Sequence, residues 1–196
     1  MYDIDQIKKL LRQRLSDKRY NHSLNVADEC IELAKKYGAD EEKAYFAGLV
    51  HDICKEMPAD ELRQQAIDSN LAMSIAETKT KALWHAVAGA GYVRDELKIN
   101  DTDIINAVRF HTVARAGMSR LEEVVYIGDL ISADRNFKDV KRIRKLAYHD
   151  LDTVMLEALV FSIGSVIEKK GLIPDYTLQA YNQYVYINGK LNQERK

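Results

Sequence analysis

The stretch AYFAGLVHDIC, residues 44–54, decides how this chain folds, because an apolar run leads directly into a histidine and an aspartate. Such a run belongs in a protein core, where an unsatisfied polar group costs about 1–3 kcal/mol. Asp40, which precedes the run, can cap a helix that reaches the region of His51. We therefore expect His51 and Asp52 to lie at the end of a buried helix and to have partners there.

Apolar residues recur at helical intervals on both sides of this stretch, as at Val26, Cys30 and Leu33 before Gly38. Strand-like alternation is scarce. Asp101 or Thr102, Ser119 and Gly171 supply further start and stop signals. Together with Pro58 and Pro174, the signals predict helices that begin near 58 and cover 103–112, 120–133, 138–148, 152–170 and 174 to about 188. The prediction is an all-α, compact multi-helix fold of roughly nine or ten helices.

Composition limits the domain count and the partners. The chain has 196 residues, 46% of them hydrophobic, and no linker-like stretch, so we expect one domain over 1–196. Its 29 Lys and Arg against 30 Asp and Glu leave no basic field that would attract nucleic acid or a membrane. Without a signal peptide or a membrane span, a cytoplasmic protein is expected. Cys30 and Cys54 lack a C-x-x-C spacing and are expected in the core.

Four of the five histidines fall in line with apolar positions of their own helices. His22 precedes Val26 by four residues, and His111 continues the stripe that contains Val108. His85 falls between Ala82 and Ala88 on its helix, and His51 follows the apolar stretch AYFAGLV (44–50). Histidines that point inward need hydrogen-bond or metal partners.

Two aspartates are suitable partners. Asp52 directly follows His51, and Asp129 adjoins a stripe that should be buried, where a carboxylate requires a cation or a donor. Imidazole and carboxylate ligands without thiolate suit divalent iron, manganese or zinc, and they argue against a structural zinc site of the cysteine type. The ordered set therefore predicts a catalytic metal site.

A metal in such a site activates water and neutralises phosphoryl oxygens, so cationic side chains should surround it. Arg19 shares a helical face with His22, Lys55 lies three residues after Asp52, and Arg135 closes the helix that carries Asp129. A solvated surface charge is the alternative for each of the three. Three further basic residues are expected to be surface charges or a helix end: Arg109, Arg115 and His149.

These residues lie in motifs that resemble the HD superfamily of metal-dependent phosphohydrolases, and in particular its branch of symmetrical bis(5'-nucleosyl)-tetraphosphatases. The likeness covers nearly the whole chain. It is carried by YNHSLNVA (20–27), GLVHDICKEMP (48–58), ALWHAVAGA (82–90), AVRFHTVARAGMS (107–119), IGDLISADRNF (127–137) and GLIPDYTLQAYN (171–182). The chain departs from the branch at Ser132-Ala133, where Glu-Pro is usual, which leaves the metal ligands intact but bears on the placement of Arg135.

The resemblance implies a metal site and its ligands. The metal would be iron, as one or two ions, with manganese or another divalent metal as the alternative, held by His22, His51, Asp52 and Asp129. Catalysis would involve Asp52, His85 and His111. The last two histidines either ligate a second metal that Asp52 bridges, or bind phosphate and assist the leaving group as general acid.

The resemblance also implies a substrate, diadenosine tetraphosphate, cleaved to two ADP, and a homodimer. Its nucleotide contacts would be Arg19, Lys55, His85, His111, Thr112, Asp129, Arg135, Leu172, Ile173, Pro174, Asp175, Tyr176 and Thr177. The last six form a loop after Gly171, whose free backbone groups could pair with the edge of an adenine. An ordinary helix connection is the alternative for that loop.

Two other functions remain open at this point. The ligand set does not choose the substrate, so the enzyme could act on a nucleoside monophosphate or another nucleotide. A non-catalytic helical domain that senses a nucleotide is the alternative from a different class, although no ligand is lost. A nucleic-acid-binding module is disfavoured by the near-zero charge.

Overall fold

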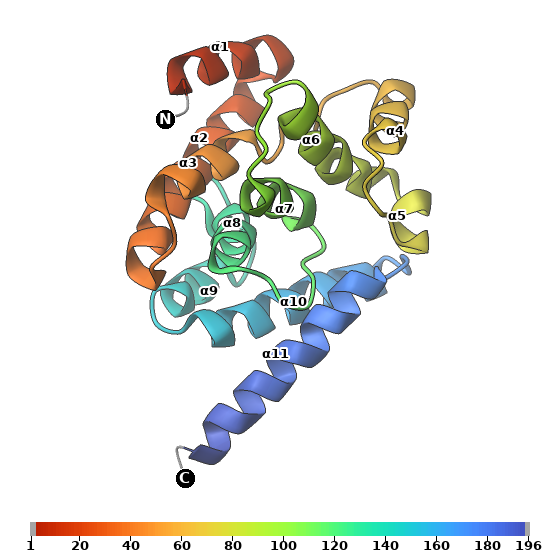
Figure 1. Ribbon diagram of the computed structural model, residues 1–196. Helices are drawn as coiled ribbons and strands as arrows, with labels where there is room; N and C mark the ends of the chain where they lie inside the picture. Colours follow the sequence, from red (N-terminus) through yellow and green to blue (C-terminus); the bar gives the residue numbers. More distant parts are fainter. Residues whose placement is uncertain (1–2, 195–196) are drawn as a thin grey trace.

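A computed structural model describes residues 3–194, over which the chain forms helices and no strand. The first two and last two residues of the expected 1–196 domain lie outside the described range. Within it there are eleven α-helices and one 3-10 helix, η1 (Figure 1). In chain order they are α1 (Ile4–Arg14), α2 (Asp17–Tyr37), α3 (Glu41–Val50), α4 (Ala59–Asp68), α5 (Ile75–Lys79), η1 (Lys81–Leu83), α6 (Trp84–Asp95), α7 (Thr102–Phe110), α8 (Arg120–Ile131), α9 (Val140–Ala147), α10 (Leu151–Glu168) and α11 (Asp175–Glu194).

Side-chain caps begin the helices where the sequence predicts. The carboxylates of Asp40 and Asp101 accept hydrogen bonds from the first-turn amides of α3 and α7. Ser119 and Glu122 form a reciprocal capping box at the start of α8. One predicted cap is wrong: the left-handed residue after α10 is Lys170, at φ +52°, and Gly171 instead donates its N–H to the Val166 carbonyl. The last helix also continues past 188, to residue 194.

The core is arranged around α8, which lies among α2, α3, α7, α9 and α10 (Figure 1). Two glycines let α2, α3 and α8 approach one another closely. A Cβ added at Gly128 would lie 2.7 Å from the sulfur of Cys30, and one added at Gly48 would lie 2.9 Å from the Cα of Ala27. Neither distance is tolerable for a real side chain, so these positions require glycine. The three helices that meet here carry or immediately precede His22, His51 and Asp129.

Both cysteines are buried free thiols, as expected. Among the described residues no helix is long and apolar enough to cross a membrane. One hydrophobic core cluster draws on residues from α1 to α11, which keeps the helix ends that carry the polar cluster in fixed positions.

Candidate metal centre

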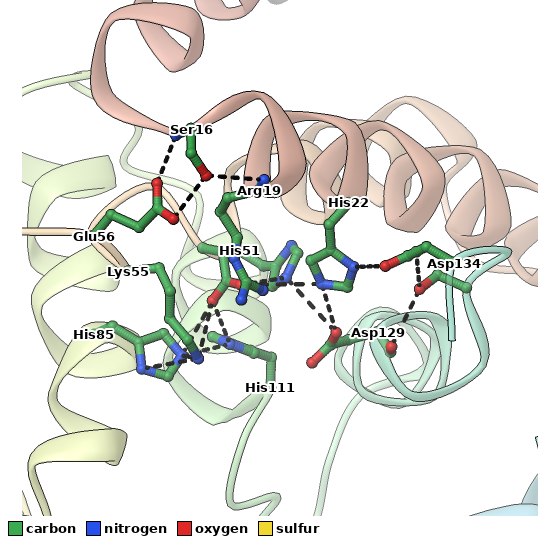
Figure 2. A network of polar contacts seen from close by, with 12 residues as sticks. Ser16, Arg19, His22, His51, Lys55, Glu56, His85, His111, Asp129 and Asp134 are labelled. Carbon is green, nitrogen blue, oxygen red and sulfur yellow. Dashed lines mark hydrogen bonds and ion pairs between the residues drawn. The ribbon is translucent and has the colours of Figure 1, made fainter. Parts of the chain in front are cut away.

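Six polar side chains predicted from the sequence converge at the centre of the molecule. Figure 2 shows His22 of α2, His51 after α3, His85 of α6 and His111 after α7 pointing toward one another, with Asp129 of α8 beside them. All four histidines and Asp52 are buried, and the side chain of Asp129 is 18% exposed. The structure therefore brings together residues that are up to 107 positions apart in the chain, from 22 to 129.

The cluster contains two overlapping sets of atoms that can hold a metal ion. His22, His51 and Asp129 form one set and His51, Asp52 and His111 the other, with the ligand atoms of each set within 4.8 Å of one another. His51 Nε2 and Asp52 Oδ1 are buried and have no hydrogen-bond partner of acceptable geometry. Buried polar atoms without partners are costly, and a cation between them would satisfy both. These nitrogen and oxygen donors fit a divalent transition metal.

Asp52 lies between two pairs of imidazoles. Its Oδ2 is 3.4 Å from His51 Nε2 and 4.0 Å from His22 Nε2. Its Oδ1 is 3.2 Å from His85 Nε2 and 3.6 Å from His111 Nε2. Each oxygen of the Asp52 carboxylate therefore faces two imidazoles.

Contacts at the outer ring nitrogens direct the Nε2 atoms into the cluster. His51 Nδ1 lies 2.6 Å from the Gly48 carbonyl, and His111 Nδ1 lies 2.7 Å from the Val108 carbonyl. Because a carbonyl only accepts, each Nδ1 carries the proton and donates it, which directs the Nε2 lone pair into the cluster, where that of His111 faces His85 Nε2 at 3.2 Å.

Asp134 orients His22 in the same way. No sequence pattern indicates this role for Asp134. Its Oδ2 lies 2.9 Å from His22 Nδ1. Its other oxygen accepts hydrogen bonds from Asn25 Nδ2 at 3.2 Å and from Ser132 Oγ at 2.9 Å. Ser132 is one of the two residues at which the chain departs from the motif quoted above, and here it supports the carboxylate that orients His22.

Burial and the neighbouring charges set the protonation of the cluster. Burial lowers the pKa of His85 to about 4 and lowers that of His111 as well. Burial acts in the same direction on His51, but the carboxylates of Asp52 and Asp129 outweigh it and raise its pKa. For Asp52 burial acts to raise the pKa, yet the facing imidazoles hold it well below its ordinary value. The shifts favour the metal-binding forms of His85, His111 and Asp52, which are neutral imidazoles and an ionised carboxylate, whereas His51 must lose a proton to bind a metal.

The three cations that the sequence places near the cluster are partly exposed, and each contacts a cluster residue. Arg19 Nη1 lies 2.7 Å from Asp52 Oδ2, and Lys55 Nζ lies 3.0 Å from His85 Nε2 (Figure 2). Arg135 forms an ion pair with the Asp129 carboxylate, and its Nε donates to the Asp129 carbonyl at 2.8 Å.

The other basic residues lie elsewhere. Arg109 was expected at the surface, but it is buried and pairs with the buried Glu77 at 2.6 Å, which compensates its charge. Arg115 pairs with Glu122. His149 is exposed after α9, in agreement with its exclusion from the site.

The segment predicted as a nucleotide-binding loop, 172–177, is a loop only as far as Pro174, because Asp175, Tyr176 and Thr177 form the first turn of α11. It packs against the residues that flank His111 and Thr112. Thr177 Oγ1 donates to the Val113 carbonyl at 2.7 Å, and the rings of Tyr176 and Phe110 meet edge to face at 5.4 Å. Thr112 Oγ1 is buried without a hydrogen-bond partner. The loop thus borders the cluster through the end of α7 and supplies no metal ligand.

Comparisons with known proteins agree with this geometry. Residues 19–151 match the family model described as the HD domain. Relatives named "Bis(5'-nucleosyl)-tetraphosphatase, symmetrical" occur in Halalkalibacterium halodurans, with 37% identity over 89% of this chain and 92% of the relative, and in Bacillus subtilis, with 34% identity over 89% and 94%. A crystal structure from Clostridium acetobutylicum, described as a predicted HD superfamily hydrolase involved in NAD metabolism, has a TM-score of 0.90 and 36% identity, and the match covers 95% of this chain and 98% of that one.

Proposed function

This chain belongs to the HD domain family, and on that premise we propose that it is a metal-dependent hydrolase that cleaves diadenosine tetraphosphate symmetrically into two ADP. The relatives named for this activity match nearly their whole length. The observation that carries the proposal is the buried cluster of four imidazoles and two carboxylates with three cations facing it. Its donors suit a divalent metal, and its cations suit a polyphosphate chain.

We propose iron as the metal, held by His22, His51, Asp52 and Asp129. A bound divalent metal supplies an acidified water and neutralises charge on the phosphoryl oxygens. The two imidazole pairs that face opposite oxygens of Asp52 would suit two ions: His22, His51, Asp52 and Asp129 would hold one, and His85 and His111, together with Asp52, would hold the other. In this arrangement His85 and His111 serve as ligands and not as the general acid.

The remaining residues of the site bind and orient the substrate. Arg19, Lys55 and Arg135 already lie within ion-pair or hydrogen-bond reach of cluster atoms, so phosphate oxygens bound at the metal would meet their donors. Thr112 and the segment 172–177, which runs into the first turn of α11, are proposed to contact the nucleoside. A nucleotide anchored in this way presents an inner phosphorus to the attacking water, so the bond broken is the central anhydride bond.

Anaerobic metal loading followed by chromatography of the products tests the function. Diadenosine tetraphosphate should give ADP alone, and equal amounts of ATP and AMP would contradict the symmetrical assignment. Faster release of phosphate from a nucleoside monophosphate would instead identify the other substrate class. The variant Asp52→Ala controls for contaminating activity, and Asp28→Ala, which removes an exposed carboxylate from the outer side of α2, is the matched control.

A further inference from the structure

A cavity of about 360 Å³ opens beside the metal cluster and has two unlike walls. One wall is formed by cluster residues, His111, Asp129 and Arg135. The apolar wall, as the apolar part of the lining is called here, contains Leu130, Phe137 and Phe161. Small-molecule sites in proteins usually have this size and this combination of an apolar surface with a few polar groups.

The apolar wall is built from a stacked pair of rings. Phe137, in the loop after α8, and Phe161, on α10, have ring centroids 4.6 Å apart and an angle of 27° between their planes. Phe161 remains 37% exposed although it lies on a helix that contributes to the core. An exposed aromatic face beside a polar cluster can stack on a flat ring, and stacking of a nucleobase on an aromatic side chain contributes about 1–3 kcal/mol.

Polar groups in the same cavity are placed for the rest of a nucleotide. The hydroxyl oxygen of Thr112 is buried and has no hydrogen-bond partner, and Thr112 lines the cavity. Arg135 and Phe137 also line a second cavity of about 300 Å³, which contains the basic side chains of Lys18 and Arg19. The path from the phenylalanine pair past Arg135 therefore leads from an apolar surface to cationic groups, which matches the order base, sugar, phosphate in a nucleotide.

We propose that this cavity binds one nucleobase of the substrate, which stacks on an outer ring face of the Phe137–Phe161 pair while Thr112 hydrogen-bonds to the nucleoside. The inference rests on the proposed function and deepens it, because it adds Phe137 and Phe161 to the residues proposed to contact the nucleoside. Stacking depends on the flat face and not on the hydrogen-bonding edge, so guanine should be accepted as well as adenine.

Two ligands that differ only by a nucleoside test the proposal. Binding of ADP and of inorganic pyrophosphate to the metal-loaded protein is measured by calorimetry. Phe137→Ala and Phe161→Ala should weaken ADP binding by about tenfold, which corresponds to about 1.4 kcal/mol, while pyrophosphate binding changes by less than about twofold. Phe161→Tyr should keep ADP binding, and Phe161→Leu should lose it, because leucine keeps bulk without an aromatic face. Tyr186→Ala, at an exposed aromatic position of α11, is the control.

Several results would overturn the proposal. Equal losses of ADP and pyrophosphate binding would mean that the rings only support the phosphate site, and unchanged ADP binding would mean that the base binds elsewhere. Retention of ADP affinity in Phe161→Leu would rule out stacking. Metal content and circular dichroism of each variant separate these outcomes from misfolding. If the wild-type protein fails to hydrolyse diadenosine tetraphosphate while its ADP binding still depends on the rings, the proposed substrate is wrong and the nucleobase subsite stands.

Discussion

Replacement of Asp134 by alanine should weaken metal binding although Asp134 is not a proposed ligand. Its carboxylate accepts from His22 Nδ1 at 2.9 Å, which fixes the ring with Nε2 directed at Asp129 Oδ1, 3.0 Å away. Without that acceptor, the His22 ring can rotate, or its proton can move to Nε2. A metal must then first restore the state in which Nε2 is unprotonated and faces Asp129, and this lowers its affinity.

The expected loss of metal affinity follows from the hydrogen bond that is removed and from the exposure of the Asp134 side chain. Loss of an outer carboxylate behind a metal-binding histidine typically costs roughly 10- to 100-fold in affinity or activity. The Asp134 side chain is 38% exposed, and solvent weakens its charge, so the loss should be near the lower limit, at about tenfold or 1.4 kcal/mol. Asp134→Asn keeps an oxygen acceptor but removes the charge, so its loss should be smaller than that of the alanine variant.

Anaerobic titration of the metal against a competing chelator measures this effect. Turnover measured at saturating metal should remain within about threefold of wild type, since Asp134 positions a ligand and does not touch the substrate. Asp139→Ala removes an exposed carboxylate from the same segment and should leave affinity unchanged. Affinity for the metal that is equal in Asp134→Ala and Asp139→Ala would refute the reasoning.

Four other perturbations test different parts of the structure. Metal should be lost and hydrolysis abolished in the ligand variants Asp52→Ala and Asp129→Ala, while circular dichroism retains the helical signal; retained metal with normal turnover would contradict the site. Three variants remove a cation: Arg19→Ala, Lys55→Ala and Arg135→Ala. They should keep the metal, while kcat/KM falls by about 10- to 100-fold because each loses a charge-assisted hydrogen bond. His85→Ala should lower both the bound metal and the rate if two ions are present, and elemental analysis that finds unchanged metal would favour a phosphate contact instead. Gly128→Ala should destabilise the fold by about 1–3 kcal/mol because its Cβ would meet the Cys30 sulfur, and the double variant with Cys30→Ala should recover most of that loss in denaturant unfolding.

Local chemistry explains why much of the fold was predictable. Asp40, Asp101 and Ser119 cap helices through amides no more than three residues away, so the signal is contained in a short stretch of sequence. The convergence of the histidines and aspartates was predictable for a related reason. Histidines and aspartates at apolar positions of helices must be buried, and burial obliges them to find partners.

Features that depend on distant pairs escaped the sequence reasoning. Asp134 contacts His22, which lies 112 positions before it in the sequence. Arg109 is buried because it pairs with Glu77, which lies 32 positions before it. Phe137 and Phe161 meet because the loop after α8 contacts α10. In each case the residue type is ordinary, and its role follows from a neighbour that no local pattern specifies.

The close contact of α2, α3 and α8 at Gly48, Gly128 and Cys30 has an evolutionary consequence. A lineage that enlarged a side chain at any of these three positions would disturb the spacing of His22, His51 and Asp129 together, so purifying selection should act against larger residues there. Phe137 and Phe161 stand outside this contact and can change without moving a ligand. New substrate preferences can therefore arise by drift at the apolar wall while the metal chemistry is inherited intact.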